Sequence, residues 1–545
     1  MKKLLTAFRP VSGKMFWLNS FGIVLLFAGL RWNSFDTPLV RDEGEYAYAA
    51  QILSRGLPPY RHSFLQKPPM VVYSYALAQA VLPNAFWAPR LLAYVCVGIA
   101  TILLGIICRI EFGPGFAFLT AWLFTLMVLL PEIQQFTANT EMFLLLPLIG
   151  TLAVCVFGLH SPLLRQRPWW AWFFGGVLAG MTFWFKYTAI PILGTIFAGW
   201  TIRELQSQGL WSLKFDVMRR AAALLLPRWL AALAGGGLAS LATLAFFIFK
   251  GGLNELWECS VIFNRAYVAS TPFGFSSLWF YIGLLWNSWW VLFLLPLALL
   301  FGRAQKVWFW VFLFFSSLLA TGASIYGHYY ILMMPFWAVL AAFGIHKCAE
   351  WLASVSRSPL VLTRQILSLG VLILVCFSDL PWISRSKEQF AIDRLRTGNP
   401  FVESPLVAQR VSELSGPLDY VYVAGSEPQI LYYANRLSPT RFVIAYPLMI
   451  PTPLAQKFQR EAIRDLQEHP PTVIVLTRSP MSWLVQEGSP QEFLSFLEQL
   501  LSSDYERIGG SIAEGSRTIW REPLPEEEVA ASELILFKRK LRNRR

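Results

Sequence analysis

The stretch FDTPLVRDEGEYAYAAQILSRGLPPYRHSFLQKPPMVVYSYALAQ, residues 35–79, decides the fold class of this chain. It follows an apolar segment long enough to cross a bilayer, and it carries the acids Asp42 and Glu43. The helix-compatible run after these acids ends at the Gly-Leu-Pro-Pro sequence of 56–59, since Gly and Pro stop helices. A Lys-Pro-Pro sequence at 67–69 then opens a second helix, because proline is favoured in a first helical turn. Two amphipathic helices beside an apolar span are typical of an interfacial loop in a membrane protein.

The composition of the whole chain is also that of a membrane protein. Of its 545 residues, 55% are hydrophobic and only 14% are charged, whereas roughly 25% are charged in an ordinary soluble domain. The net charge of +13 lies between apolar segments and is not gathered on a soluble surface. This distribution argues against a nucleic-acid-binding protein.

Apolar segments that can cross a bilayer need roughly 17–25 residues, and they predict about 11 transmembrane helices. These segments are 15–31, 87–108, 115–131, 141–159, 169–185, 188–202, 229–249, 275–301, 307–323, 329–346 and 363–380. The predicted fold class is therefore an all-α polytopic membrane domain over residues 1–380, followed by a different kind of domain.

The basic residues between the apolar segments predict the orientation of the chain. With the N-terminus inside, seventeen Lys and Arg residues fall in inner segments before residue 381, and seven fall in outer ones. Because cytoplasmic loops carry the excess of Lys and Arg, the first loop (residues 32–86) and residues 381–545 are predicted outside the cytoplasm. Most acids of the membrane part, Glu45 among them, share this outer side. Since desolvating charge is costly, this pattern predicts an outer cavity lined by carboxylates.

Residues 381–545 predict a small extracytoplasmic α/β domain. Short β-rich runs alternate with helical stretches. The runs are LDYVYVAG (418–425), RFVIAYPL (441–448) and TVIVLTR (472–478), and the helical stretches are 452–469 and 489–502. The last residues, LFKRKLRNRR, are interpreted as a basic tail.

The segment RDEGEYAYAAQIL, followed after a short loop by QKPPMVVY, resembles the first outer loop of polyprenyl-phosphate-dependent glycosyltransferases with the GT-C fold. The pattern is most similar to that of the bacterial aminoarabinose transferases of lipid A and the protein O-mannosyltransferases. Four later segments resemble motifs of this family in the same order: TANTEMFLLLP (137–147), GMTFWFKYTAIPIL (180–193), GHYYILMMPFWAVLAA (327–342) and GSEPQILYYANRLSPTRF (425–442). The resemblance extends over nearly the whole chain. It implies a transferase that moves a sugar from a lipid monophosphate to an envelope lipid, glycan or protein on the outer face of the membrane. The lipid would be undecaprenyl phosphate in a bacterium or dolichyl phosphate in a eukaryote, and the compact C-terminal domain without tandem outer insertions favours a bacterial plasma membrane.

The resemblance also implies roles for individual residues. Asp42 is expected to be the catalytic base, and Glu43 its neighbour in the catalytic motif. A leaving phosphate gains negative charge and needs a cation, so Lys67 is expected to bind it. Further substrate-binding residues are expected at the outer ends of the helices and in outer loops: Glu141, Lys186, Arg265, His328 and Tyr330.

No cofactor is predicted as obligatory. Paired acids such as Asp42 and Glu43 are compatible with a divalent cation, and no cluster of His and Cys suggests zinc. The expected partners are a polyprenyl-phosphate sugar donor, an envelope acceptor and membrane lipid, with no nucleic acid.

Other functions remain open at this point. A transporter or flippase for a lipid-linked sugar would share the size and the lipid ligand, but such folds have internal repeats and midplane polar features. A non-catalytic scaffold leaves the acidic and Lys-Pro-Pro segments without a role. Within the enzyme class, ligation or polymerisation of a glycan by the same fold is the alternative.

Overall fold

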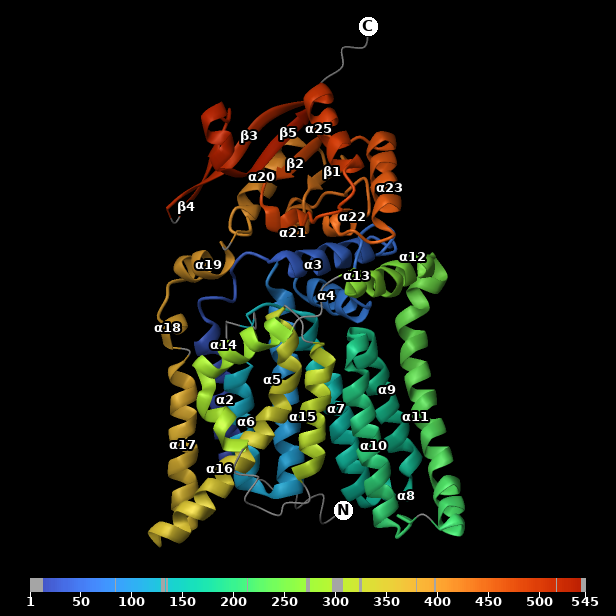
Figure 1. Cartoon of the computed structure of the whole chain (residues 1–545), viewed down its shortest axis with the longest axis vertical. Helices are drawn as coiled ribbons and strands as arrows, with labels where there is room; N and C mark the ends of the chain where they lie inside the picture. Colours follow the sequence, from blue (N-terminus) through green and yellow to red (C-terminus); the bar gives the residue numbers. More distant parts are fainter. Residues whose placement is uncertain are drawn as a thin grey trace. The chain divides into compact units, whose positions relative to one another are not determined.

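The computed structural model describes most of the chain as two groups of helices and one sheet (Figure 1). The described residues are 13–83, 85–128, 133, 136–212, 214–270, 275–296, 307–322, 326–378, 380–396, 398–515 and 517–540. Helices make up 72% of the structure, and a small sheet lies in the C-terminal part. The predicted class, a helical membrane domain with a small α/β part, is confirmed.

Contacts divide the chain into two compact units. The first comprises the described residues of 1–32, 90–243 and 273–384, and the second comprises 33–89, 244–272 and the described residues of 385–545. The first loop therefore groups with the C-terminal segment. The predicted domains, 1–380 and 381–545, stay predictions.

The first unit consists of apolar helices. They are α2 (Gly13–Arg31), α5 (Ala88–Phe112), α6 (Pro114–Met127), α7 (Thr140–His160), α8 (Pro162–Gln166), α9 (Pro168–Phe185), α10 (Ile190–Ser207), α11 (Phe215–Lys250), α14 (Phe275–Leu294), α15 (Val307–Thr321), α16 (Met334–Ser356), α17 (Leu360–Phe377) and α18 (Leu380–Ile383), with short turns η2 (Tyr187–Ala189) and η5 (Gly327–Met333). α11 runs on past residue 243 into the second unit.

Each of the eleven predicted segments coincides with one of these helices, although 129–131, 297–301, 323 and 379 lie outside the described residues. Within the described residues, six helices are long and apolar enough to cross a membrane. The count of eleven spans is therefore not confirmed. α11 also differs from its prediction, because it begins at residue 215 and not at 229.

Small residues allow two helices of this unit to approach closely. A Cβ atom on Gly176 of α9 would lie 2.0 Å from the carbonyl oxygen of Ala232 in α11, and one on Gly235 would lie 2.0 Å from that of Phe173. Only glycine fits at these two positions. Close backbone contact through small residues is how helices associate in lipid, where the hydrophobic effect does not draw them together.

The second unit is built on a five-stranded sheet with the order β1-β2-β5-β3-β4. β1 (Val421–Ala424) pairs in parallel with β2 (Val473–Thr477), and the other pairings, by β3 (Tyr505–Glu514), β4 (Arg517–Arg521) and β5 (Ser532–Arg539), are antiparallel. The helices of the unit are α3 (Arg41–Ser54), α4 (Met70–Val81), α12 (Leu253–Trp257), η3 (Glu258–Phe263), α13 (Asn264–Ser270), α19 (Lys387–Leu395), α20 (Ser404–Leu414), α21 (Pro428–Ala434), α22 (Tyr446–Met449), α23 (Ala455–Glu468), α24 (Pro480–Trp483), α25 (Glu492–Asp504) and η6 (Glu526–Ala531).

The predictions for this C-terminal part are partly confirmed. Strands β1 and β2 and helices α23 and α25 lie where they were expected. The predicted strand at 441–448 is wrong, because these residues form a buried irregular segment followed by α22. Phe442, Val443 and Ile444 are all buried, and burial of a loop gives the same apolar run as a strand. The predicted basic tail is also wrong in part, since its first residues belong to β5.

The first loop forms part of the core of this unit. α3 packs against α4 and α21, and its residues Tyr48 and Ile52 join the cluster of buried residues beneath β1 and β2. A Cβ atom on Gly44 would lie 2.6 Å from the backbone nitrogen of Gln429, so α3 and α21 touch at a glycine. The two helices predicted in the first loop, α3 and α4, are confirmed.

Candidate active site

The acidic pair of the first loop lies in the first turn of α3. The Glu43 side chain is buried, and its Oε2 accepts a hydrogen bond from the backbone N–H of Val40 at 3.3 Å. This bond caps the start of the helix. Asp42 is half-buried in the same turn, where a negative charge interacts favourably with the helix dipole. The geometry gives Glu43 a structural task, and the catalytic roles of Asp42 and Glu43 stay predictions.

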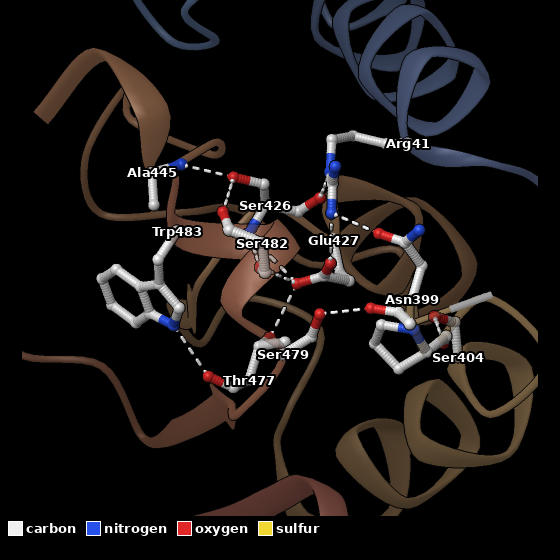
Figure 2. Close-up of polar contacts among 12 residues, drawn as sticks. Arg41, Asn399, Ser404, Ser426, Glu427, Ala445, Thr477, Ser479, Ser482 and Trp483 are labelled. Atoms are coloured by element: carbon white, nitrogen blue, oxygen red, sulfur yellow. Dashed lines mark hydrogen bonds and ion pairs between the residues drawn. The ribbon is translucent and has the colours of Figure 1, made fainter. Parts of the chain in front are cut away.

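Arg41, the residue before Asp42, is anchored to the C-terminal part of the same unit (Figure 2). Its Nη2 atom forms an ion pair with Glu427 Oε1 at 3.1 Å and donates to Asn399 Oδ1 at 3.0 Å. Its Nε atom donates to the carbonyl oxygen of Ser426 at 2.7 Å. The start of α3 is thus held by three contacts from residues more than 350 positions away in the sequence.

Glu427 is the centre of this network. Its side chain is fully buried, and its Oε2 atom accepts hydrogen bonds from Ser482 Oγ at 2.6 Å, Thr477 Oγ1 at 2.7 Å and the backbone N–H of Ser426 at 3.0 Å (Figure 2). Three donors and one cation satisfy the carboxylate, and a buried charge is tolerated only with such partners. The segment of Glu427 was recognised in the sequence only as a motif, without a role for this residue.

Glu45 lies three residues after Asp42, and residues at this spacing share a face of a helix. Its side chain is only 3% exposed, and its carboxyl accepts a hydrogen bond from the backbone N–H of Gln66. Burial and the charge of Asp42 raise the pKa of Glu45 well above its usual value, although Lys67 and Arg41 oppose the shift. Glu45 therefore holds its proton more tightly than an ordinary glutamate, a property that the sequence did not reveal.

Lys67 is placed by the backbone that leads into α4. Its carbonyl oxygen accepts a hydrogen bond from the hydroxyl of Tyr60 at 2.8 Å, and the carbonyl oxygen of Gln66 accepts one from Asn264 Nδ2 at 2.7 Å. The charges of Asp42 and Lys67 both act on Glu45. The structure therefore places Glu45 near the charges of both Asp42 and Lys67.

Arg265 follows Asn264 on α13 and is exposed. It belongs to the same unit as Lys67 and lies next to the residue that fixes Gln66. Its predicted contact with substrate stays a prediction.

The other four predicted residues cluster within the first unit. Glu141 in the first turn of α7 forms a buried ion pair with Lys186, which follows α9. The Lys186 ammonium also lies 3.0 Å from the centroid of the Tyr329 ring. Tyr329 lies between two other predicted residues, His328 and Tyr330, in η5, and both of those are buried.

The side chains of this cluster contact one another and neighbouring rings within the protein. The His328 and Tyr329 rings are 4.8 Å apart, and the Tyr330 ring lies 4.8 Å from that of Tyr281. A buried carboxylate and ammonium that pair with each other compensate much of their desolvation. Substrate binding by Glu141, Lys186, His328 and Tyr330 stays a prediction.

Within the described residues, no group of three His, Cys, Asp or Glu side chains is arranged to hold a metal ion. The prediction on cofactors is untested by this arrangement and stays a prediction.

The comparison of the sequence with known proteins is independent of this geometry. Residues 66–226, which include Lys67, Glu141 and Lys186, match the family described as dolichyl-phosphate-mannose-protein mannosyltransferase. Among curated proteins, none matches the sequence.

Solved structures resemble almost the whole chain. ArnT from Cupriavidus metallidurans bound to undecaprenyl phosphate aligns with a TM-score of 0.55 at 12% identity, over 95% of this chain and 99% of that chain. Its apo form aligns with a TM-score of 0.53 at 12% identity, over 93% and 98%. AglB from Archaeoglobus fulgidus, in complex with an inhibitory peptide and a dolichol-phosphate, aligns with a TM-score of 0.48 at 12% identity, over 97% and 77%.

The fold of this chain is therefore similar to that of ArnT over nearly its whole length. With the family match to residues 66–226, this confirms the resemblance found in the sequence. The chain therefore has a GT-C-like fold, and its residues 66–226 match a family of polyprenyl-phosphate-dependent glycosyltransferases.

Proposed function

We propose that the protein transfers a sugar from a polyprenyl-phosphate donor to an acceptor of the bacterial envelope. The observation that carries the proposal is the site on α3, where a half-buried carboxylate, Asp42, and a lysine, Lys67, act on the same buried acid. ArnT, which shares the fold, was solved with undecaprenyl phosphate, and the family match is to an enzyme that uses dolichyl-phosphate mannose. Both names point to a lipid monophosphate as donor.

The two residues divide the chemistry of this transfer. When the acceptor is a hydroxyl, its oxygen forms a bond to the anomeric carbon of the sugar while the bond from that carbon to the phosphate oxygen breaks. Asp42 takes the proton of the hydroxyl, and the polyprenyl phosphate leaves with the bonding electron pair. Lys67 neutralises the charge that grows on the phosphate. A positioned base of this kind contributes roughly 10²–10⁴-fold to the rate.

The proposal is tested with purified protein in nanodiscs, supplied with polyprenyl-phosphate sugars and with envelope lipids, glycans and proteins as acceptors. Mass spectrometry of the acceptors from a deletion strain identifies which of them to use. Transfer of the sugar with release of polyprenyl phosphate supports the proposal. Movement of the intact lipid-linked sugar across the bilayer, without transfer, would instead identify a flippase.

Lys67→Ala should reduce both donor binding and turnover by about 10–150-fold, because a hydrogen bond to a charged group is worth roughly 1.5–3 kcal/mol. The matched control is Lys250→Ala, at the exposed end of α11. Binding of a fluorescent polyprenyl phosphate, measured beside the transfer rate, reports the effect. Equally small losses of donor binding and turnover in both variants would mean that Lys67 packs its alkyl chain along the membrane interface and does not bind the phosphate.

The active site is proposed to face outward from the plasma (inner) membrane, as the basic residues of the sequence predict. In a variant without native cysteines, Ser54→Cys and Ser503→Cys should react with an impermeant thiol reagent in intact cells, because both positions are exposed. Ser356→Cys, exposed at the end of α16 on the predicted inner side, should react only after lysis. The reverse labelling pattern would contradict the proposed orientation.

A further inference from the structure

Two buried polar atoms beside Asp42 and Lys67 have no hydrogen-bond partner among the residues that the structure describes. They are Oε1 of Glu45 and Nε2 of Gln66. The two residues are neighbours in space, because the backbone N–H of Gln66 donates to the Glu45 carboxyl. Buried polar groups are almost always paired, and leaving one unpaired is costly. A partner from outside the chain is the simplest explanation.

Close contacts hold the backbone at both residues. Glu45 follows Gly44, where α3 touches α21 with no room for a Cβ atom. The backbone at Gln66 is fixed on both sides, by Asn264 at its own carbonyl and by Tyr60 at the next one. The two unpaired atoms therefore belong to side chains on a fixed backbone, as expected for a preorganised binding site.

The chemistry of the two groups matches a hydroxyl. The carboxamide of Gln66 donates hydrogen bonds, and the raised pKa of Glu45 favours its carboxylic acid form, which both donates and accepts. A sugar hydroxyl likewise donates one hydrogen bond and accepts others. Because burial disfavours the ionised form of Glu45, its side chain also repels a phosphate bound by the nearby Lys67 less than an ordinary carboxylate would.

We propose that Glu45 and Gln66 form a subsite that binds a hydroxyl group of the sugar on the lipid-phosphate donor. The inference rests on the proposed function, since it takes Lys67 as the ligand of the phosphate. The donor sugar is favoured over the acceptor because it is bonded to that phosphate and must lie next to it. The subsite thus selects the sugar, whereas Lys67 recognises the phosphate that all such donors share.

The test compares two kinds of ligand. One is bare undecaprenyl phosphate, and the other is a panel of undecaprenyl phosphates that carry single hexoses or pentoses. Wild-type protein in detergent should bind at least one sugar-bearing lipid more tightly than the bare lipid. Gln66→Leu and Glu45→Leu should each weaken binding of that lipid by about 10-fold, while binding of the bare lipid stays the same. Glu45→Gln, which keeps a donor and an acceptor, should lose less.

The matched control is Gln79→Leu on α4, because the Gln79 amide already donates to the carbonyl oxygen of Ala47 in α3. It should not change the preference for the sugar-bearing lipid. Thermal unfolding of each variant identifies any that is misfolded, and Gln66→Leu, outside the helices, provides the measurement if Glu45→Leu does not fold.

The remaining outcomes all count against the subsite. Equal weakening of both kinds of lipid would show a structural role only, and no weakening of either would show that the two atoms bind water. Loss of transfer to the acceptor with unchanged donor binding would place the subsite on the acceptor side. Failure of the wild type to bind even bare undecaprenyl phosphate would contradict the proposed function itself, whereas a normal transfer rate with no sugar preference would overturn only the subsite.

Discussion

Turnover should fall by about 10²–10⁴-fold in Asp42→Asn, because this change removes the basic oxygen and keeps the size of the side chain. Asp42 is half-buried in the first turn of α3, in the site that also holds Lys67. Donor binding should change little, since the base acts on the acceptor and not on the lipid phosphate. The transfer rate and the affinity for polyprenyl phosphate, measured on the same preparation, separate these two effects.

Glu43→Gln is the control beside it. The Glu43 carboxylate caps the helix by accepting from Val40, and a glutamine oxygen can still accept that bond, so turnover should drop far less than in Asp42→Asn. An Asp42→Asn enzyme with near-normal turnover would remove Asp42 from the mechanism. That result would also point to a phosphate as the acceptor, because a phosphate acceptor needs no base whereas a hydroxyl acceptor does.

The largest loss of stability is expected from Glu427→Ala. The change removes the partner of the Arg41 guanidinium and the acceptor of two buried hydroxyls, those of Thr477 and Ser482. Breaking a buried ion pair by removing one member costs about 3–5 kcal/mol. Unfolding of the purified protein, followed by tryptophan fluorescence, should show this loss. Turnover should fall as well, because Arg41 directly precedes Asp42.

Two further variants give this prediction its controls. Glu427→Gln keeps the shape and most of the hydrogen bonds but loses the charge opposite Arg41, so its loss should be intermediate. Glu413→Ala removes an exposed ion pair with Arg410 on α20, and exposed pairs contribute little. If Glu427→Ala unfolded no more easily than Glu413→Ala, the network would not hold α3 in place.

The apolar helices could be located from the sequence because crossing a bilayer requires a long apolar run. The segments 141–159 and 363–380, for example, both coincide with helices, α7 and α17. The run at 441–448 was misassigned because apolar periodicity cannot separate a buried strand from a buried loop. The sequence does not predict β5, because the last residues of this strand are basic and are interpreted as part of a tail.

The site was predictable where the motif itself carries the signal. Asp42 and Lys67 stand out because they are charged residues in a segment next to an apolar span. Glu427 could not be assigned a role in this way, because its partner Arg41 is 386 residues away. Glu45 was only one acid among several, and its significance comes from burial and from the missing partner of Oε1. Neither the burial nor the missing partner can be recognised from the neighbouring residues in the sequence.

The shared core of α3 and the sheet has a consequence for the order of biosynthesis. Tyr48 and Ile52 are made early, but the cluster that encloses them includes Leu534 and Leu536 of the last strand. At a synthesis rate of roughly 5–20 residues per second, α3 waits about 25–95 s for the strand that completes its surroundings. A ribosome-bound chain therefore has Asp42 and Lys67 but not the completed core that holds α3, and the proposed activity should begin only after β5 has been made and has joined the sheet.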